Sequence, residues 1–218
     1  MILAVCGGKG GVGKTTVSLN LAAALDAVLV DADLGMADVP AGRGPDLHDV
    51  LAGRATAVEA VRESRAVSLL PCGRTLAGAR EGDPRRLADA VEDVASAYGD
   101  VVVDCPAGLR ADVGVPLLVA DAAVVVTTPD RAAVADALRA RSLAVELDAG
   151  LAAVAYNRAG AASEEVADAL GAPVVAVPET AAVAATLETG TPVGESAPES
   201  VPAGRFAALA DRVRACEE

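Results

Sequence analysis

Aromatic residues are almost absent from this 218-residue chain, which has no tryptophan, two tyrosines and one phenylalanine. Hydrophobic residues still make up 53% of it, so a core must be built from alanine, valine and leucine. Apolar runs such as Ala122 to Thr127 are far shorter than the roughly 20 residues of a membrane-spanning helix. Because the start also lacks the basic and apolar regions of a signal peptide, we expect a cytoplasmic protein.

Cysteine and histidine are scarce as well. The chain has four cysteines, Cys6, Cys72, Cys105 and Cys216. None of them forms a C-x-x-C pair, which argues against a zinc site or a cluster scaffold, and we expect small buried side chains. The only histidine, His48, falls on a predicted helix, where we expect a solvated or capping residue rather than a catalytic base.

Positive charge is in short supply, and lysine above all. The net charge is −13 and the pI about 4.5, which opposes general attraction to DNA or to anionic lipid headgroups. Only two residues are lysine, whereas 16 are arginine. Acidity together with lysine depletion favours a cytoplasm of very high salt, and thus a halophilic source. A GC-rich genome is the alternative, but it explains the acid excess less well.

Both lysines, Lys9 and Lys14, lie in one glycine-rich segment. Residues Gly8 to Thr15 fit the Walker A pattern G-x-x-x-x-G-K-[ST], in which successive backbone N–H groups form a nest for phosphate oxygens. Lys14 would reach the β- and γ-phosphates and the Thr15 hydroxyl would bind Mg²⁺. An apolar strand, Ile2 to Cys6, precedes the loop and a helical run follows it, so a plain glycine turn explains the segment less well.

Acidic residues end two further apolar runs, Val28 to Asp33 and Val101 to Asp104. The carboxyl ends of parallel strands line the ligand crevice of an open sheet, which places these acids near the phosphates. The remaining predicted strands are Val67 to Leu70, Ala122 to Thr128, Leu151 to Tyr156 and Val174 to Val177, and the predicted helices include Asp83 to Ala97, Arg131 to Leu147 and Ser163 to Leu170. This alternation predicts one α/β domain over residues 1–218, with a doubly wound, mostly parallel sheet and helices on both faces.

The additional lysine, Lys9, narrows the class of P-loop protein to which the chain can belong. Lys9 to Thr15, read as Lys-Gly-Gly-Val-Gly-Lys-Thr, resembles the deviant Walker A box of the MinD/ParA family, P-loop ATPases of the SIMIBI type, and resembles MinD most. Further segments follow in the family's order: Asp31 to Met36 for switch I, Leu47 to Leu51 for the next helix, Asp104 to Gly108 for switch II, then Ala120 to Ala122, Thr127 to Pro129, Asn157-Arg158 and Val177 to Glu179.

The resemblance implies a role for each matching residue. Lys9 would cross to the partner subunit's nucleotide in a homodimer closed by ATP, and Asp33 would position or activate the attacking water. Asp104 would hold Mg²⁺ through a water, whereas Asp31 would only anchor the strand end or the switch loop. The residues expected to bind ATP are Gly8, Lys9, Gly10, Gly11, Val12, Gly13, Lys14, Thr15, Thr16, Asn157, Arg158, Pro178 and Glu179, the last four around adenine.

Two regions depart from the family pattern. Asp38 stands where relatives often carry asparagine, and the segment between Asp33 and the next helix is short. Membrane-bound relatives carry a basic amphipathic helix at the C-terminus, whereas here Phe206, Leu209, Ala210 and Val213 form a narrow apolar stripe followed by glutamates. We expect this helix to pack on its own domain, so direct membrane insertion is not expected.

Three functions therefore compete. The first is a MinD-like ATPase whose ATP-bound homodimer positions a cell-division, motility or signalling assembly through an unidentified protein cargo or activator. The second is a ParA-like segregation ATPase on DNA, which would need arginines such as Arg139, Arg141, Arg205, Arg212 and Arg214 to cluster. The third is a metabolic enzyme or cluster carrier, which the missing C-x-x-C pair and the presence of Lys9 disfavour.

Overall fold

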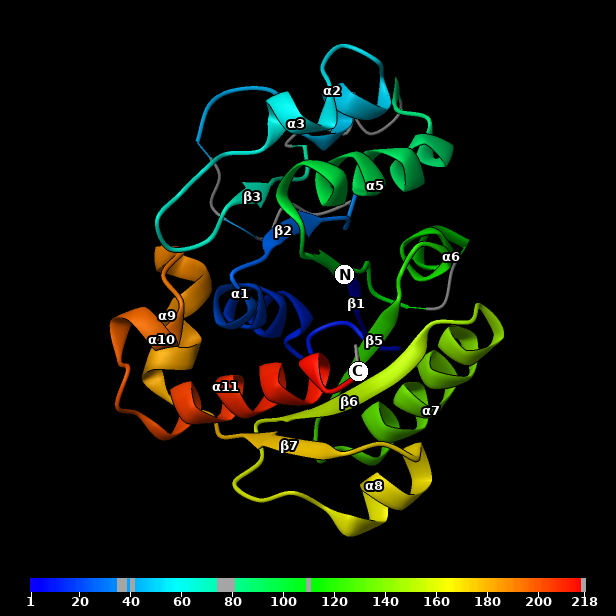
Figure 1. The fold of residues 1–218 in the computed structure, drawn as a ribbon. Coiled ribbons are helices and arrows are strands. Elements are labelled where there is room, and N and C mark those ends of the chain that lie inside the picture. The colour runs from blue at the N-terminus through cyan, green and yellow to red at the C-terminus, as the bar shows by residue number, and fades with distance from the viewer. Residues whose placement is uncertain (35–38, 40–41, 74–80, 109–110, 217–218) are drawn as a thin grey trace.

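A computed structural model describes residues 1–34, 39, 42–73, 81–108 and 111–216, which form a seven-stranded sheet between two layers of helices (Figure 1). The strand order is β3-β2-β4-β1-β5-β6-β7, and neighbouring strands pair in parallel throughout. The strands are β1 (Ile2–Cys6), β2 (Val28–Asp31), β3 (Leu69–Leu70), β4 (Val101–Asp104), β5 (Ala122–Thr127), β6 (Gly150–Asn157) and β7 (Val174–Val177). The predicted α/β fold is confirmed.

Helices cover both faces of this sheet. They are α1 (Lys14–Leu25), α2 (Leu47–Leu51), α3 (Ala57–Ala60), the 3₁₀ helix η1 (Pro84–Arg86), α5 (Leu87–Tyr98), α6 (Ala111–Leu118), α7 (Arg131–Glu146), α8 (Glu164–Leu170), α9 (Ala181–Thr189), α10 (Val193–Ser196) and α11 (Val201–Arg214). Helices α1, α9, α10 and α11 pack on one face, and α5 to α8 pack on the other (Figure 1). Within β1, Leu3 and Val5 point to the first layer and Ala4 and Cys6 to the second. Burial on both faces explains why the strands read as unbroken apolar runs.

The C-terminal helix packs on its own domain, as predicted. The stripe residues Phe206, Leu209, Ala210 and Val213 of α11 are all buried in the core that α1 shares. Within the described residues, none of the helices combines the length and the apolar composition that a bilayer crossing requires. Glu217 and Glu218 lie outside the described residues, as do Asp38 and the Gly35-Met36 part of the predicted switch I.

Two predictions about single residues are wrong. Cys216 is exposed rather than buried, because it follows the last turn of α11, where no other element covers it; the other three cysteines are buried as expected. His48 is 3% exposed rather than solvated. Its helix α2 buries four of its five residues, and only Asp49 stays outside.

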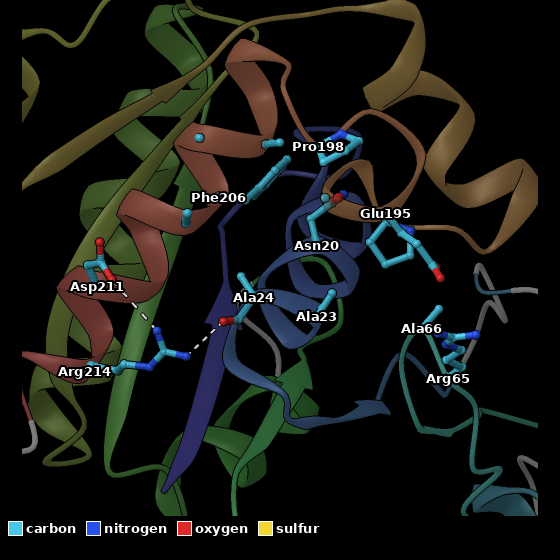
Figure 2. Close-up of a pocket in the computed structure, with 15 residues that line it drawn as sticks. Asn20, Ala23, Ala24, Arg65, Ala66, Glu195, Pro198, Phe206, Asp211 and Arg214 are labelled. Carbon is cyan, nitrogen blue, oxygen red and sulfur yellow. Dashed lines mark hydrogen bonds and ion pairs between the residues drawn. The ribbon is translucent and has the colours of Figure 1, made fainter.

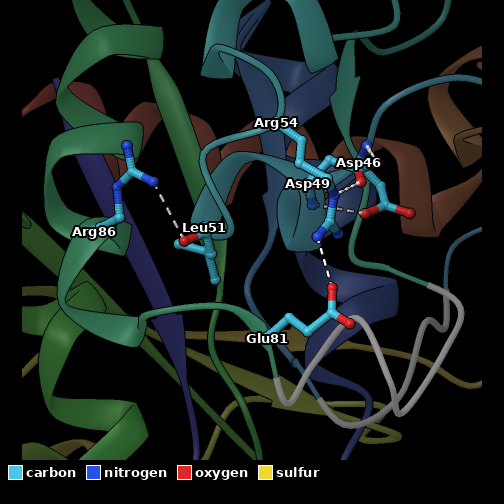
Figure 3. Close-up of polar contacts among 6 residues, drawn as sticks. All are labelled: Asp46, Asp49, Leu51, Arg54, Glu81 and Arg86. Atoms are coloured by element: carbon cyan, nitrogen blue, oxygen red, sulfur yellow. Dashed lines mark hydrogen bonds and ion pairs between the residues drawn. The ribbon is translucent and has the colours of Figure 1, made fainter.

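A capping box and the ion pairs of Arg54 stabilise the start of α2, so His48 is not needed as a cap. The Asp46 side chain accepts from the Asp49 amide, and the Asp49 side chain accepts in return from the Asp46 amide (Figure 3). Arg54 then donates to Asp49 at 2.8 Å and to Glu81 at 2.7 Å. These contacts lie on the exposed side of α2. The buried side of the helix faces the segment that follows β2.

Asn20, a buried polar residue of α1, joins the nucleotide-side end of the helix to α10. Its Nδ2 donates to the Thr16 carbonyl at 2.8 Å, and its Oδ1 accepts from the Val193 amide at 2.7 Å. Asn20 also lines a cavity of about 540 Å³ between α1, α10, α11 and residues 65–66 (Figure 2). The side chain therefore ties α1 to the first residue of α10, beside this cavity.

Replacement of Asn20 should cost stability out of proportion to its size. Asn20→Leu keeps the volume but leaves the buried Val193 amide without its acceptor, which costs about 1–3 kcal/mol of unfolding free energy. Urea unfolding at constant m-value measures it. Ser142→Ala, which removes an exposed hydroxyl that bonds only within α7, is the control and should change little. Equal effects of the two substitutions would contradict the role given to Asn20.

Candidate nucleotide-binding site

The turn between β1 and α1 needs glycine at several positions for different reasons. Gly11 and Gly13 have φ angles of 80° and 93°, the left-handed region that other residues rarely adopt. A Cβ on Gly13 would also overlap the Asn157 side chain, and one on Gly8 would overlap the backbone of α7 at Asp136. The loop is therefore held close to both neighbours, in the open conformation of an anion-binding turn at the N-terminus of α1.

Four polar side chains meet where this turn enters the helix. Lys14 is 8% exposed and Asp104, at the end of β4, is 1% exposed. The Ser18 hydroxyl donates to Asp104 Oδ1 at 2.8 Å and lies 3.0 Å from the Lys14 carbonyl. Thr15 also hydrogen-bonds the Asp104 carboxyl. The two predicted metal-site residues, Thr15 and Asp104, are thus brought together.

The electrostatics of Asp104 favour a cation beside it. Burial raises the pKa of this carboxyl to about 6, although hydrogen bonds from Thr15 and Ser18 and the charge of Lys14 act in the opposite direction. A hydroxyl and a carboxylate are hard oxygen donors, the type that Mg²⁺ prefers when water and phosphate complete its shell. No group of three or more His, Cys, Asp or Glu that could hold a metal occurs among the described residues, so the pair suits a metal shared with a phosphate.

A cavity of about 280 Å³ opens at this edge of the sheet. Its lining joins the glycine loop and the first turn of α1 to four other segments and consists of Gly10, Gly11, Gly13, Lys14, Thr15, Thr16, Asp33, Ala107, Arg158 and Leu187. Most of the residues predicted to bind phosphate therefore share one surface with the predicted catalytic acid Asp33. Asp33 follows β2, and its amide donates to Asp31 Oδ1 at 3.2 Å, so the buried Asp31 helps to shape the turn.

The residues predicted to surround adenine are placed differently from one another. Asn157 is buried and uses both ends of its amide within the protein: Nδ2 donates to the Val12 carbonyl at 2.8 Å, and Oδ1 accepts from the Arg158 amide at 3.0 Å. In this structure it braces the P-loop. Arg158 and Glu179 are exposed, pair at 3.9 Å and lie with the half-buried Pro178 at the ends of β6 and β7. Adenine contacts at these four residues stay a prediction.

Lys9 is held away from the cavity. Its Nζ donates to Asp130 Oδ2 at 2.8 Å, and Asp130 also caps the N-terminus of α7. The hydrogen bond and charge of Asp130 raise the pKa of Lys9, and Lys9 in turn lowers the pKa of Asp130. Both side chains are about half exposed, at 45% and 52%. A pair so open to water is weakly held and is screened by salt, so Lys9 can leave it at little cost.

Sequence reasoning missed Ser18 and Asp130. Ser18 lies one helical turn after Lys14, so its position on the Asp104 side of α1 could have been inferred from the i, i+4 spacing. Asp130 pairs with a residue 121 positions away, and no local pattern marks such a contact. Its role as an N-cap of the predicted helix from Arg131 was the only available signal.

The raised pKa of Asp104 predicts a pH-dependent stability of the nucleotide-free protein. The carboxyl ionises near 3.8 when unfolded but only near 6 when folded, so stability falls as pH rises from about 4 to about 6. Asp104→Asn stays neutral and should be more stable than the parent above pH 6 by about 3 kcal/mol, with no advantage below pH 4.

Urea unfolding in EDTA at pH 4, 6 and 8 measures this difference. Asp93→Asn, which removes an exposed charge from α5, controls for the change in net charge and should show no comparable gain. An Asp104→Asn protein no more stable than the parent at pH 8 would show that burial of this carboxylate carries no penalty.

Several known proteins are similar to this chain in sequence. In a curated set, an uncharacterized ATP-binding protein of Methanocaldococcus jannaschii is 31% identical over 215 residues, 91% of this chain and 81% of that protein. Another from the same organism is 34% identical, but the match spans 73% of this chain and 65% of that one. The septum site-determining protein MinD of Synechocystis is 29% identical over 97% of this chain and 88% of its own length.

Solved structures of MinD have the same fold as this chain. The cell division ATPase MinD of Pyrococcus furiosus is 30% identical with a TM-score of 0.90, covering 97% of each chain. MinD of Pyrococcus horikoshii complexed with Mg-ADP is 29% identical with a TM-score of 0.89, covering 97% of this chain and 94% of that one. The profile of the CobQ/CobB/MinD/ParA nucleotide binding domain matches residues 3–193. The chain therefore belongs to the CobQ/CobB/MinD/ParA family, and its fold matches that of MinD.

Proposed function

We propose that this protein is a MinD-like ATPase that hydrolyses ATP to ADP and phosphate with Mg²⁺. The observation that carries the proposal is the meeting of Lys14, Thr15, Ser18 and Asp104 at the end of the glycine loop. A phosphate chain would lie over the loop amides, with the Lys14 ammonium at its outer oxygens. The Mg-ADP complex of Pyrococcus horikoshii MinD, with this fold, supports the choice of nucleotide and metal.

Hydrolysis by this site would depend on positioning and charge rather than on a titrating base. Lys14 and the loop amides would stabilise negative charge on the transferred phosphoryl group, and Thr16 would contact the α-phosphate. Asp33, on the opposite wall of the cavity, would orient the attacking water. Mg²⁺, held by Thr15 and through water by Asp104, would supply charge neutralisation at the β- and γ-oxygens.

ATP would also close a homodimer, and Lys9 is the residue that supports this step. Its side chain is half exposed and outside the cavity, and a weak surface pair with Asp130 holds it among the described residues. Exchange of the Asp130 carboxylate for the partner subunit's phosphates would replace one charge-assisted hydrogen bond by several. The dimer would then persist until hydrolysis removes the γ-phosphate, so the nucleotide would act as a timer.

The cellular role that fits best is spatial positioning of an assembly. Several of the similar proteins are septum site-determining proteins or cell division ATPases. By analogy, the ATP-bound dimer would recruit a protein cargo or activator, and that partner would accelerate turnover by completing the segment around Asp33. Cell division, motility and signalling assemblies are all candidates for the cargo.

A DNA-riding, ParA-like function has less support. The arginines that would have to cluster lie on helices that cover opposite faces of the sheet, α7 for Arg139 and Arg141 and α11 for the others (Figure 1). Arg139 pairs with Asp136 and Arg214 with Asp211, which reduces their field further. With a net charge of −13, binding to phosphate backbones is disfavoured. The presence of Lys9 favours a dimer switch over a metabolic ligase.

The two lysines should separate binding from dimerisation. Lys14→Ala should weaken ATP binding about 100-fold, because a charge-assisted contact to phosphate is lost. Lys9→Ala should bind ATP almost normally but should lose both ATP-dependent dimerisation and hydrolysis. Calorimetry measures the affinity, and light scattering with phosphate release measures the other two quantities.

Arg85→Ala, which removes a side chain that is 90% exposed, controls for the loss of one positive charge and should behave as the parent protein. Normal ATP affinity in Lys14→Ala would refute the P-loop assignment. A Lys9→Ala protein that hydrolyses ATP at the parental rate would instead refute the dimer step and leave the assignment of the nucleotide site intact.

A further inference from the structure

Behind Asp33, on the side away from the cavity, two buried side chains bind two consecutive backbone carbonyls. The Cys72 thiol donates to the Asp33 carbonyl at 3.0 Å, and His48 Nε2 lies 3.2 Å from the Leu34 carbonyl. Cys72 is 1% exposed and His48 is 3% exposed, and Cys72 Sγ is 3.8 Å from His48 Nε2. Elements far apart in sequence, α2 and the segment after β3, thus meet at the turn that carries Asp33.

Both groups are suited to donate. Burial and the charge of Asp31 raise the pKa of Cys72 well above its ordinary value, so the thiol keeps its proton. Because a carbonyl only accepts, a hydrogen bond from His48 to the Leu34 carbonyl requires the hydrogen on Nε2. Gly73 lies so close to this ring that a Cβ there would overlap Nδ1, which fixes the ring position.

The same turn is held from its other side. The Asp33 amide donates to Asp31 Oδ1 at 3.2 Å, and the Leu34 amide donates to the Ala32 carbonyl at 2.9 Å. Both backbone polar groups of Asp33 are therefore bound, one toward β2 and one toward Cys72. This arrangement directs the Asp33 side chain to the cavity that it shares with Lys14 and Thr15.

Stability alone does not account for His48. The position lies among Leu47, Val50 and Leu51 of a nearly buried helix, where an apolar side chain would pack without a polar cost. Buried His48 Nδ1 has no hydrogen-bond partner among the described residues, which is a net cost of placing an imidazole there. A group that is costly to bury and that contacts the backbone next to the proposed catalytic acid Asp33 has a reason to be there beyond packing.

We propose that His48 and Cys72 are positioning residues for Asp33: their hydrogen bonds to the Asp33 and Leu34 carbonyls fix the turn so that the Asp33 carboxylate meets the attacking water. The inference rests on the proposed ATPase function. Neither side chain lines the nucleotide cavity, so their loss should lower kcat and leave nucleotide affinity unchanged.

Two pairs of variants test the proposal in the full chain. His48→Leu and Cys72→Ala each remove a hydrogen-bond donor, whereas His48→Gln and Cys72→Ser each keep a donor at the same position. We expect single-turnover ATP hydrolysis at saturating Mg-ATP to fall about 10- to 100-fold in the first pair and to recover in large part in the second. The affinity for a fluorescent ATP analogue should stay within about twofold of the parent. Cys216→Ser, at an exposed thiol, is the control and should be silent.

A double-mutant cycle makes the test specific to Asp33. In the Asp33→Ala background, His48→Leu should lower kcat no further, because the residue that it positions is gone. A loss that persists in this background, or that His48→Gln and Cys72→Ser fail to repair, would reduce both residues to structural roles and overturn the proposal. If His48→Leu fails to fold, the Cys72 pair carries the same comparison.

The failures of the two proposals can be told apart. A parent protein that binds no ATP and hydrolyses none would overturn the ATPase function and this inference together. An active parent whose Asp33→Ala variant is inactive, but whose His48→Leu and Cys72→Ala variants hydrolyse at the parental rate, would overturn this inference alone.

Discussion

The buried carboxylate of Asp104 is the group around which the site is organised. It ends β4, next to β1, and it is bound by Ser18 and Thr15 from the helix that follows β1. Without those hydrogen bonds and the nearby Lys14, a charge at this depth would be very unfavourable, and even with them the pKa rises to about 6. Strand, loop and first helical turn are therefore coupled through one side chain, and a bound divalent cation would complete its neutralisation.

Helix α1 connects the site around Asp104 to the rest of the molecule. Its first turn presents Lys14, Thr15 and Thr16 to the cavity, and one turn later Asn20 binds the Thr16 carbonyl and the Val193 amide. From the opposite wall, the turn after β2 presents Asp33 and is held by side chains of α2 and of the segment after β3. The residues proposed to bind phosphate and the residue proposed to position water thus belong to different elements.

The sequence was informative where chemistry is local and less so where it depends on distant contacts. The glycine loop and the acids at the ends of β2 and β4 were predictable, because strands buried on both faces read as apolar runs and the P-loop pattern is specific. The burial of His48 could not be predicted, because α2 is too short to show a periodic pattern. The residues that cover its buried side, Leu34 and Cys72, are 14 and 24 positions away from His48. β3 is shorter than the predicted run from Val67 to Leu70 and lies at the sheet edge, where it pairs with β2.

The central claim is that Lys9 acts on the partner subunit, and mixing two inactive variants tests it most directly. In a heterodimer of Lys9→Ala with Lys14→Ala, the site of the Lys9→Ala subunit has its own Lys14 and receives Lys9 from the other chain. We expect ATP hydrolysis in high potassium chloride to return in the mixture, although each variant alone is inactive. A mixture that forms heterodimers by native mass spectrometry yet hydrolyses no more ATP than the separate variants would contradict action across the interface.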